Sequence, residues 1–189
     1  GDFAFPPHQY IPYLNISEKA AQNGVACISP AKTFNISGMV DAIAVIPNEK
    51  HRHQFHEFAH RYQINKVNVF ASVATEAAYK DGAKWLDALL VYIQGNVDLI
   101  RSFLEKNHIG VSLIEPEGTF LVWLDFRELG LDVKELEVFL AKEAGIALSP
   151  GYWFGREGAG FARMTIACPR ERVQTALNNL EMAIKKRSA

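Results

Sequence analysis

A helix of more than twenty residues is predicted for the middle of this chain. Between Gly82 and His108, apolar side chains recur at steps of three and four residues, the spacing of one helix face. They are Trp85, Leu86, Leu89, Leu90, Ile93, Val97, Ile100, Phe103 and Leu104. Since so long a helix usually bridges two units, we place a domain boundary near its start. The expected domains are residues 1–82 and 83–189.

Helical and strand patterns alternate along the first 82 residues, which is typical of an α/β domain. Helices are predicted at 17–22, 48–63 and 69–81, and strands at 25–28 and 40–46. Ser17 and Asn48 are the expected N-caps of the first two helices. Both strands are short apolar runs, so we expect each to be buried on both faces.

The rest of the chain predicts a small α+β unit. Strands are expected at 111–114, 119–124, 146–148 and 161–167, and helices at 133–143 and 171–186. The turn at Pro116–Gly118 should join the first two strands into a hairpin. No internal repeat or low-complexity tract is present in the sequence.

The turn between the two N-terminal strands carries one lysine, Lys32, within the segment SPAKTFNISG. A lysine between buried strands is expected to be partly desolvated, which would make its free amine available as a nucleophile. Most lysines in loops are solvated surface groups. Position alone therefore does not assign a catalytic role to Lys32.

The segment Ser29–Gly38 resembles the pyridoxal-phosphate lysine segment of the aminotransferase-like cystathionine β-lyases, the MalY/PatB group. The resemblance implies that Lys32 is the catalytic lysine to which pyridoxal 5'-phosphate is covalently attached. It also implies that Ser29 contacts the cofactor phosphate. Ala31 stands where the group commonly has a serine, so one possible polar contact is missing.

A second segment, Phe161–Arg170, resembles the closing motif of the same group. Strand alternation places Arg163 on the face opposite Ala162 and Met164. The resemblance implies that Arg163 binds the α-carboxylate of the substrate through a bidentate pair. The loop at Gly151–Gly155 corresponds to a stretch that lies over the substrate, which makes Tyr152 a second candidate. A salt-bridged arginine and aromatic rings that plug a core edge are the structural alternatives.

The resemblance runs from about Ile11 to the C-terminus but covers only half of the group's protein. It implies an α/β fold: the C-terminal portion of the fold type I pyridoxal-phosphate-dependent transferase fold, with the end of the large domain and the whole small domain. The expected function is the C-terminal part of a carbon–sulfur β-lyase acting on cystathionine- or cysteine-type amino acids, in an enzyme that forms homodimers. An aminotransferase of the same family, or a catalytically silent fragment without the N-terminal cofactor-binding half, remain alternatives.

Composition indicates a globular cytoplasmic protein without nucleic-acid or membrane partners. The 20 basic and 21 acidic residues give a net charge of −1, so no basic surface is expected. No run approaches the roughly 18 apolar residues that a membrane span needs. Cys27 and Cys168 lie in apolar runs without a nearby partner, and we expect both to be buried reduced thiols.

A zinc-peptidase motif occurs by its letters at His56–His60, in the order His-Glu-Phe-Ala-His. A metzincin continues with glycine and histidine three and six residues later, whereas this chain has Gln63 and Lys66. Since no second motif completes a site, we expect a solvated helix face and no metal.

Overall fold

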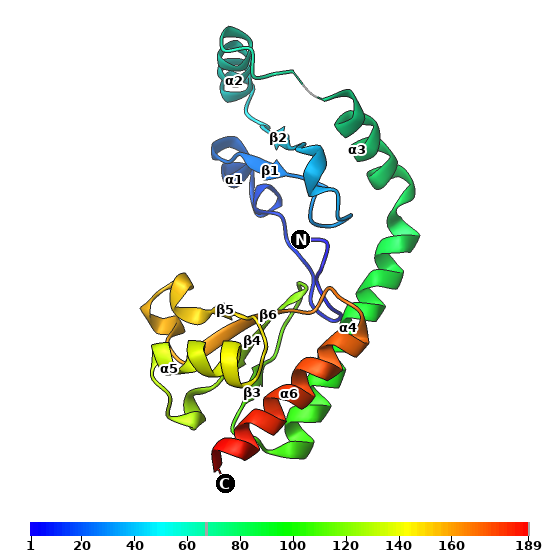
Figure 1. The fold of residues 1–189 in the computed structure, drawn as a ribbon. Helices are drawn as coiled ribbons and strands as arrows, with labels where there is room; N and C mark the ends of the chain where they lie inside the picture. The colour runs from blue at the N-terminus through cyan, green and yellow to red at the C-terminus, as the bar shows by residue number, and fades with distance from the viewer. Residues whose placement is uncertain (67, 189) are drawn as a thin grey trace. The chain divides into compact units, whose positions relative to one another are not determined.

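The computed structural model describes residues 1–66 and 68–188. The chain forms two compact units, Gly1–Leu89 and Leu90–Ala189. Helix α4 (Ala83–Asn107) begins in the first unit and continues into the second, and it confirms the long helix predicted from the apolar periodicity (Figure 1). None of the helices in the described parts of the chain combines the length and apolarity needed to cross a membrane.

The first unit combines short helices with two strands. Its elements are α1 (Glu18–Asn23), β1 (Ala26–Ile28), β2 (Ile43–Val45), α2 (Glu49–Arg61) and α3 (Val69–Asp81), with single 3-10 turns at Tyr13–Asn15 and Ser37–Met39. The predicted caps are confirmed. Ser17 accepts a hydrogen bond from the backbone N–H of Ala20 at 3.1 Å, and Asn48 accepts one from that of His51 at 3.2 Å.

Strands β1 and β2 pair antiparallel, with Cys27 opposite Ala44. The prediction that both strands are buried was wrong, because Ile28, Ile43 and Val45 are exposed. Two strands of three residues each cannot cover their own faces. Cys27 is exposed for the same reason, so the expectation of a buried thiol also fails there.

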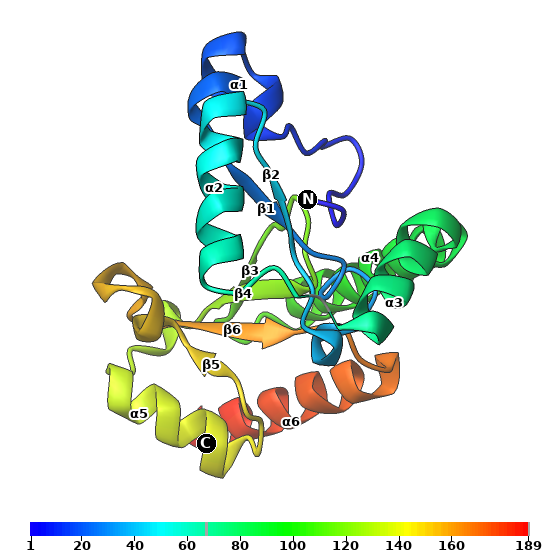
Figure 2. The same cartoon turned by 90° about the horizontal axis from the view of Figure 1, so that it is seen from above.

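The second unit is an antiparallel sheet with helices. Its strands are β3 (Ser112–Ile114), β4 (Leu121–Asp125), β5 (Ser149–Pro150) and β6 (Phe161–Thr165), in the order β3-β4-β6-β5. Helices α5 (Val133–Val138) and α6 (Arg170–Ser188) lie along one side of this sheet (Figure 2). Val122 and Leu124 of β4 and Ala162 and Met164 of β6 are buried, so both strands alternate, which was predicted for β6.

Two elements of this unit differ from prediction. The strand expected at 146–148 is absent, and β5 is formed instead by Ser149 and Pro150, opposite Arg163 and Ala162. The residues that pair with β6 are therefore set by its register, which places Ser149 and Pro150 opposite it. The apolar character of residues 146–148 did not decide the pairing. The helix predicted at 133–143 changes after Val138 into a π-helical turn, Phe139–Glu143.

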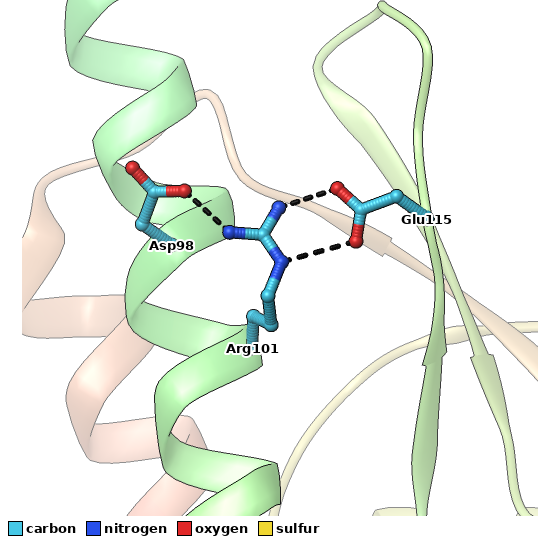
Figure 3. A network of polar contacts seen from close by, with 3 residues as sticks. All are labelled: Asp98, Arg101 and Glu115. Carbon is cyan, nitrogen blue, oxygen red and sulfur yellow. Dashed lines mark hydrogen bonds and ion pairs between the residues drawn. The ribbon is translucent and has the colours of Figure 1, made fainter.

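An ion-pair network ties α4 to the chain after β3. The Arg101 guanidinium donates to both carboxylate oxygens of Glu115, including an Nε bond of 3.1 Å, and to Asp98 Oδ1 at 2.6 Å (Figure 3). Both carboxylates are largely exposed, so the network aligns the hairpin on the helix and adds little stability.

A fully buried amide joins three elements of the second unit. Asn96 on α4 donates from Nδ2 to the carbonyl oxygens of Ile166 at 2.9 Å and Cys168 at 3.2 Å. Its Oδ1 accepts from Arg170 Nε at 2.9 Å, at the start of α6. Gly95 leaves room for this guanidinium, since a Cβ there would collide with it. The end of β6 and the start of α6 are thus both fixed on α4.

Replacing Asn96 with alanine should lower the free energy of unfolding by about 2–3 kcal/mol, because buried polar groups would lose their partners. Chemical denaturation of the 189-residue chain measures this. Asn178→Ala is the matched control, since Asn178 is exposed on α6 and should change stability by less than about 0.5 kcal/mol. Equal effects of the two substitutions would contradict the assignment.

Candidate functional site

The lysine turn is closed by its own backbone and by Ser29. The N–H of Phe34 donates to the carbonyl oxygen of Pro30 at 2.9 Å, and that of Ile36 to Ala31 at 3.0 Å. Ser29 Oγ accepts from the N–H of Ala31 at 3.2 Å and donates to the carbonyl oxygen of Asp41 at 2.6 Å. Ser29 therefore links the start of the turn to the segment that enters β2.

Side chains on either side of Lys32 anchor the turn. Thr33 is buried and donates from Oγ1 to Asp2 Oδ2 at 2.6 Å. The Phe34 ring lies between Tyr79 and Trp85, with centroid distances of 6.0 and 5.9 Å. The turn is thus held by the N-terminal segment, by α3 and by the start of α4.

Asp41 also contacts α3, where its carboxylate Oδ2 accepts a hydrogen bond from Thr75 Oγ1 at 2.5 Å. Thr75 is buried, so this bond is sheltered from water. The residue before Asp41 is Val40, which has a left-handed backbone with φ of 54°. A β-branched residue is strained in that region, and the contacts on both sides of Val40 hold it there.

Lys32 is exposed, and its ε-amine has no hydrogen-bond or ion-pair partner among the described residues. The expectation of a partly desolvated lysine was wrong for this chain, because the flanking strands that should have shielded it are themselves exposed. The turn therefore presents a lysine side chain without a partner in the described part of the chain, on a braced backbone. A lysine side chain in this position has the primary amino group that covalent attachment of a carbonyl-bearing cofactor requires.

The carboxylates beside the turn also act on Tyr79. The pKa of the Tyr79 phenol lies above its usual value, first because partial burial disfavours the phenolate. The negative charges of Asp2 and Asp41 raise the pKa further. The region next to the turn is therefore electronegative.

Arg163 lies on β6, directly opposite Trp123 of β4. Its Cζ lies 4.6 Å from the centroid of the Phe154 ring, and its Nη2 donates to Ser149 Oγ at 3.3 Å. Arg163 Nε is buried without a hydrogen-bond partner in the described part of the chain. A buried, unpaired N–H on a guanidinium leaves it able to receive an anion.

Aromatic rings continue away from Phe154 along the sheet. Trp123 meets Phe154 edge to face at 5.6 Å and stacks on Phe161 at 5.7 Å. Arg127 lies over the far ring, 4.7 Å from the Phe161 centroid, and donates to both oxygens of Asp125. The pKa of the Asp125 carboxyl is lowered, chiefly by this hydrogen-bonded guanidinium.

The predicted site residues fall into two groups. Ser29 and Lys32 share the turn of the first unit, and Arg163 and Tyr152 belong to the second. Tyr152 contacts Glu137 of α5, with its hydroxyl 3.5 Å from Oε2, while Phe154 supplies the ring against Arg163. Sequence reasoning missed Phe154 because three adjacent aromatics gave no basis for choosing among them.

The His-Glu-Phe-Ala-His motif lies on α2 with His56 and His60 both exposed. Glu57 pairs with His53 at 3.4 Å. Across residues 1–66 and 68–188, no group of three or more His, Cys, Asp or Glu side chains is arranged to hold a metal ion.

Comparison with known proteins gives consistent matches over nearly the whole chain. Residues 1–180 match the family described as aminotransferase class I and II. Cystathionine beta-lyase PatB of Bacillus subtilis (strain 168) is 34% identical over 94% of this chain and 46% of its own length. Protein MalY of Escherichia coli (strain K12) is 31% identical over 97% of this chain and 47% of its own.

A solved structure agrees with the sequence matches. Cystalysin of Treponema denticola, which contains a pyridoxal 5'-phosphate cofactor, superposes with a TM-score of 0.90 at 32% identity. The match covers 98% of this chain and 47% of cystalysin. The chain thus spans about half the length of the proteins it resembles.

Asp2→Asn should lower the pKa of Tyr79 toward the ordinary tyrosine value, because asparagine keeps an acceptor for Thr33 but removes a charge. NMR titration of the Tyr79 ring measures this. Because the folded-state pKa is raised, the stabilising contribution of Tyr79 should be complete below about pH 10 and be lost as the pH rises through the folded-state pKa. Asp87→Asn, at an exposed position on α4, should leave the titration unchanged; no shift with Asp2→Asn would contradict the assignment.

Proposed function

Because this chain belongs to the aminotransferase class I and II family, we propose that it is the C-terminal part of a pyridoxal-phosphate-dependent carbon–sulfur β-lyase acting on cystathionine- or cysteine-type amino acids. The observation that carries the proposal is the free amine of Lys32 on a braced turn, in a chain similar to PatB and MalY. In this proposal residues 1–82 complete a large cofactor-binding domain and residues 83–189 form a small domain.

The exposed apolar surface of the first unit supports the proposal that this chain is part of a larger enzyme. Exposed apolar side chains occur on both strands and along α2, where Phe55, Phe58 and Tyr62 are uncovered. Exposed apolar surface of this kind usually marks an interface. We propose that the other half of the enzyme and a second subunit of a homodimer cover these faces.

Ser29 and Lys32 would hold the cofactor. When bound, pyridoxal phosphate supplies an electron-withdrawing ring that stabilises negative charge at the substrate Cα. Lys32 Nζ would hold the cofactor, and once the substrate amine has displaced it, the released Lys32 amine would take the Cα proton. In this structure the Ser29 hydroxyl donates a hydrogen bond to the backbone carbonyl oxygen of Asp41, so donation to a phosphate requires the hydroxyl to exchange that partner.

Arg163 would bind the substrate α-carboxylate. Its Nε and the neighbouring terminal nitrogen form a fork suited to two parallel hydrogen bonds. Phe154 and Ser149 keep the guanidinium in place, since one stacks on it and the other accepts from Nη2. Departure of a thiolate would then break the bond between the substrate Cβ and sulfur. After addition of water, the remaining fragment would leave as pyruvate and ammonia.

An aminotransferase of the same family is the second candidate function. The family match favours it, because the description covers aminotransferases as a class. Both reactions begin with removal of the Cα proton by the lysine, and they differ in where that proton goes next. Release of pyruvate and a thiol from cystathionine supports the lyase, whereas transfer of the amino group to a keto acid supports the aminotransferase.

Labelling of Lys32 tests the cofactor assignment without requiring activity. The 189-residue chain is incubated with pyridoxal phosphate, reduced with borohydride and mapped by peptide mass spectrometry. We expect the label on Lys32, and its loss in Lys32→Ala. Lys66→Ala should leave the label in place, since Lys66 is an exposed lysine outside the turn. Labelling of surface lysines without preference for Lys32 would contradict the assignment and favour a catalytically silent fragment.

Phe154→Leu should raise the KM for the amino-acid substrate about fivefold, because loss of a cation–π contact costs about 1 kcal/mol. The change in kcat should be less than about twofold if Phe154 positions Arg163 for binding only. Steady-state kinetics of the full-length polypeptide that carries this chain measures both. Trp153→Leu is the control on the same turn, since Trp153 has no ring contact with Arg163. A fall in kcat with unchanged KM would rule out this role.

A further inference from the structure

A small apolar cavity lies in the second unit, and Arg163 is not among the described residues that line it. It has a volume of about 170 Å³ and lies between α5 and the segment 146–148, which leads through β5 into two 3-10 turns, Gly151–Phe154 and Arg156–Gly158. Its lining includes Leu136 and Leu140 from the helix, Ile146 and Leu148 from the segment, and Tyr152 and Trp153 from the turns. A dry cavity of about 150 Å³ can hold one benzene molecule, so this space suits a single small ring.

The aromatic wall of the cavity has a fixed shape. Gly151 and Gly158 approach so closely that a Cβ on either would collide with the carbonyl oxygen of the other. Gly155, between them, has φ of 131°, which only glycine adopts readily. Backbone contact therefore fixes the path of the turn that carries Tyr152 and Trp153 to the rim.

The helical wall is irregular at the same place. Leu140 and Ala141 of the lining belong to the π-helical turn Phe139–Glu143. The N–H of Ala144 donates to the carbonyl oxygen of Phe139 at 2.9 Å, which closes this turn. Such turns are rare and occur frequently at functional sites. The irregular turn is a second, independent indication that the cavity has a use.

The rim carries one charge. Of the described residues that line the cavity, Glu137 alone is ionisable to a carboxylate, and Tyr152 donates to its Oε2 at 3.5 Å. An apolar space with one anionic group at its mouth selects a ligand with an apolar body and a cationic end.

We propose that this cavity binds a small arylalkylammonium ion, with the ring between α5 and Trp153 and the ammonium group at Glu137. The site goes beyond the proposed lyase or aminotransferase reaction, because it uses neither the lysine turn nor Arg163. The Tyr152 hydroxyl lies at this rim, 3.5 Å from Glu137 Oε2.

Titration of the isotope-labelled 189-residue chain with phenethylammonium chloride tests the site. The indole N–H signal of Trp153 should shift and saturate, while those of Trp85 and Trp123 stay in place, because neither lines the cavity. Phenylacetate, which has the same ring and the opposite charge, should bind at least about threefold more weakly at equal ionic strength. Equal binding of the two compounds, or no saturation with either, would overturn the proposal.

Two kinds of variant distinguish the contribution of the cavity space to binding from that of the Glu137 carboxylate. Ala141→Phe should abolish the shift by filling the mouth, whereas Ala167→Phe, an exposed alanine outside the lining, should not. Glu137→Gln should weaken binding of phenethylammonium about threefold and remove the preference over phenylacetate, while Glu157→Gln leaves both unchanged. Ala147→Phe is the second filling variant if Ala141→Phe disturbs the fold. Unchanged binding in a folded filling variant would exclude the cavity.

Discussion

The position of Lys32 depends on two hydroxyl–carboxylate bonds, Thr33 to Asp2 and Thr75 to Asp41. The first unit buries few large side chains, and these two threonines are among its buried residues. A small apolar core does not fix the path of a loop precisely, because apolar packing is not directional. Short, sheltered hydrogen bonds do fix that path, because their geometry is directional. The lysine turn is therefore fixed by a polar frame, and the amine itself stays free.

The second unit is held differently. Its sheet and helices bury a continuous set of large apolar side chains, and one polar residue, Asn96, lies fully buried among them. That amide fixes the end of β6 relative to α4, and β6 carries Arg163. The substrate-binding candidate thus stands on a rigid strand, whereas the cofactor-binding candidate stands on a turn. Rigid elements position a binding fork accurately, while an exposed amine on a turn has room to move during a reaction.

Local patterns predicted much of this arrangement. The caps at Ser17 and Asn48, the β3–β4 hairpin and the outward face of Arg163 all follow from short-range rules of spacing and capping. Burial could not be predicted in the same way, because apolar strands at 25–28 and 40–46 look alike whether or not other strands cover them. The π-helical turn after Val138 and the contact of Phe154 with Arg163 both depend on tertiary packing, which leaves no local signal.

Two arginines, Arg127 and Arg163, lie against the aromatic rings of the second unit, and a comparison of their partners shows why Arg163 can receive an anion. Arg127 and Arg163 both lie against rings that flank Trp123, but among the described residues only Arg127 pairs with a carboxylate, that of Asp125 at the end of β4. Had Asp125 paired with Arg163, the guanidinium would be neutralised and its fork occupied. Asp125 pairs with Arg127 instead, so its carboxylate does not compete with an anion for Arg163. Phe154 then orients Arg163 without supplying a charge, since a ring face attracts a cation yet leaves its N–H groups free. The arrangement keeps one guanidinium without a carboxylate partner on a rigid strand, with its Nε unpaired in the described part of the chain, which is what recognition of a substrate carboxylate requires.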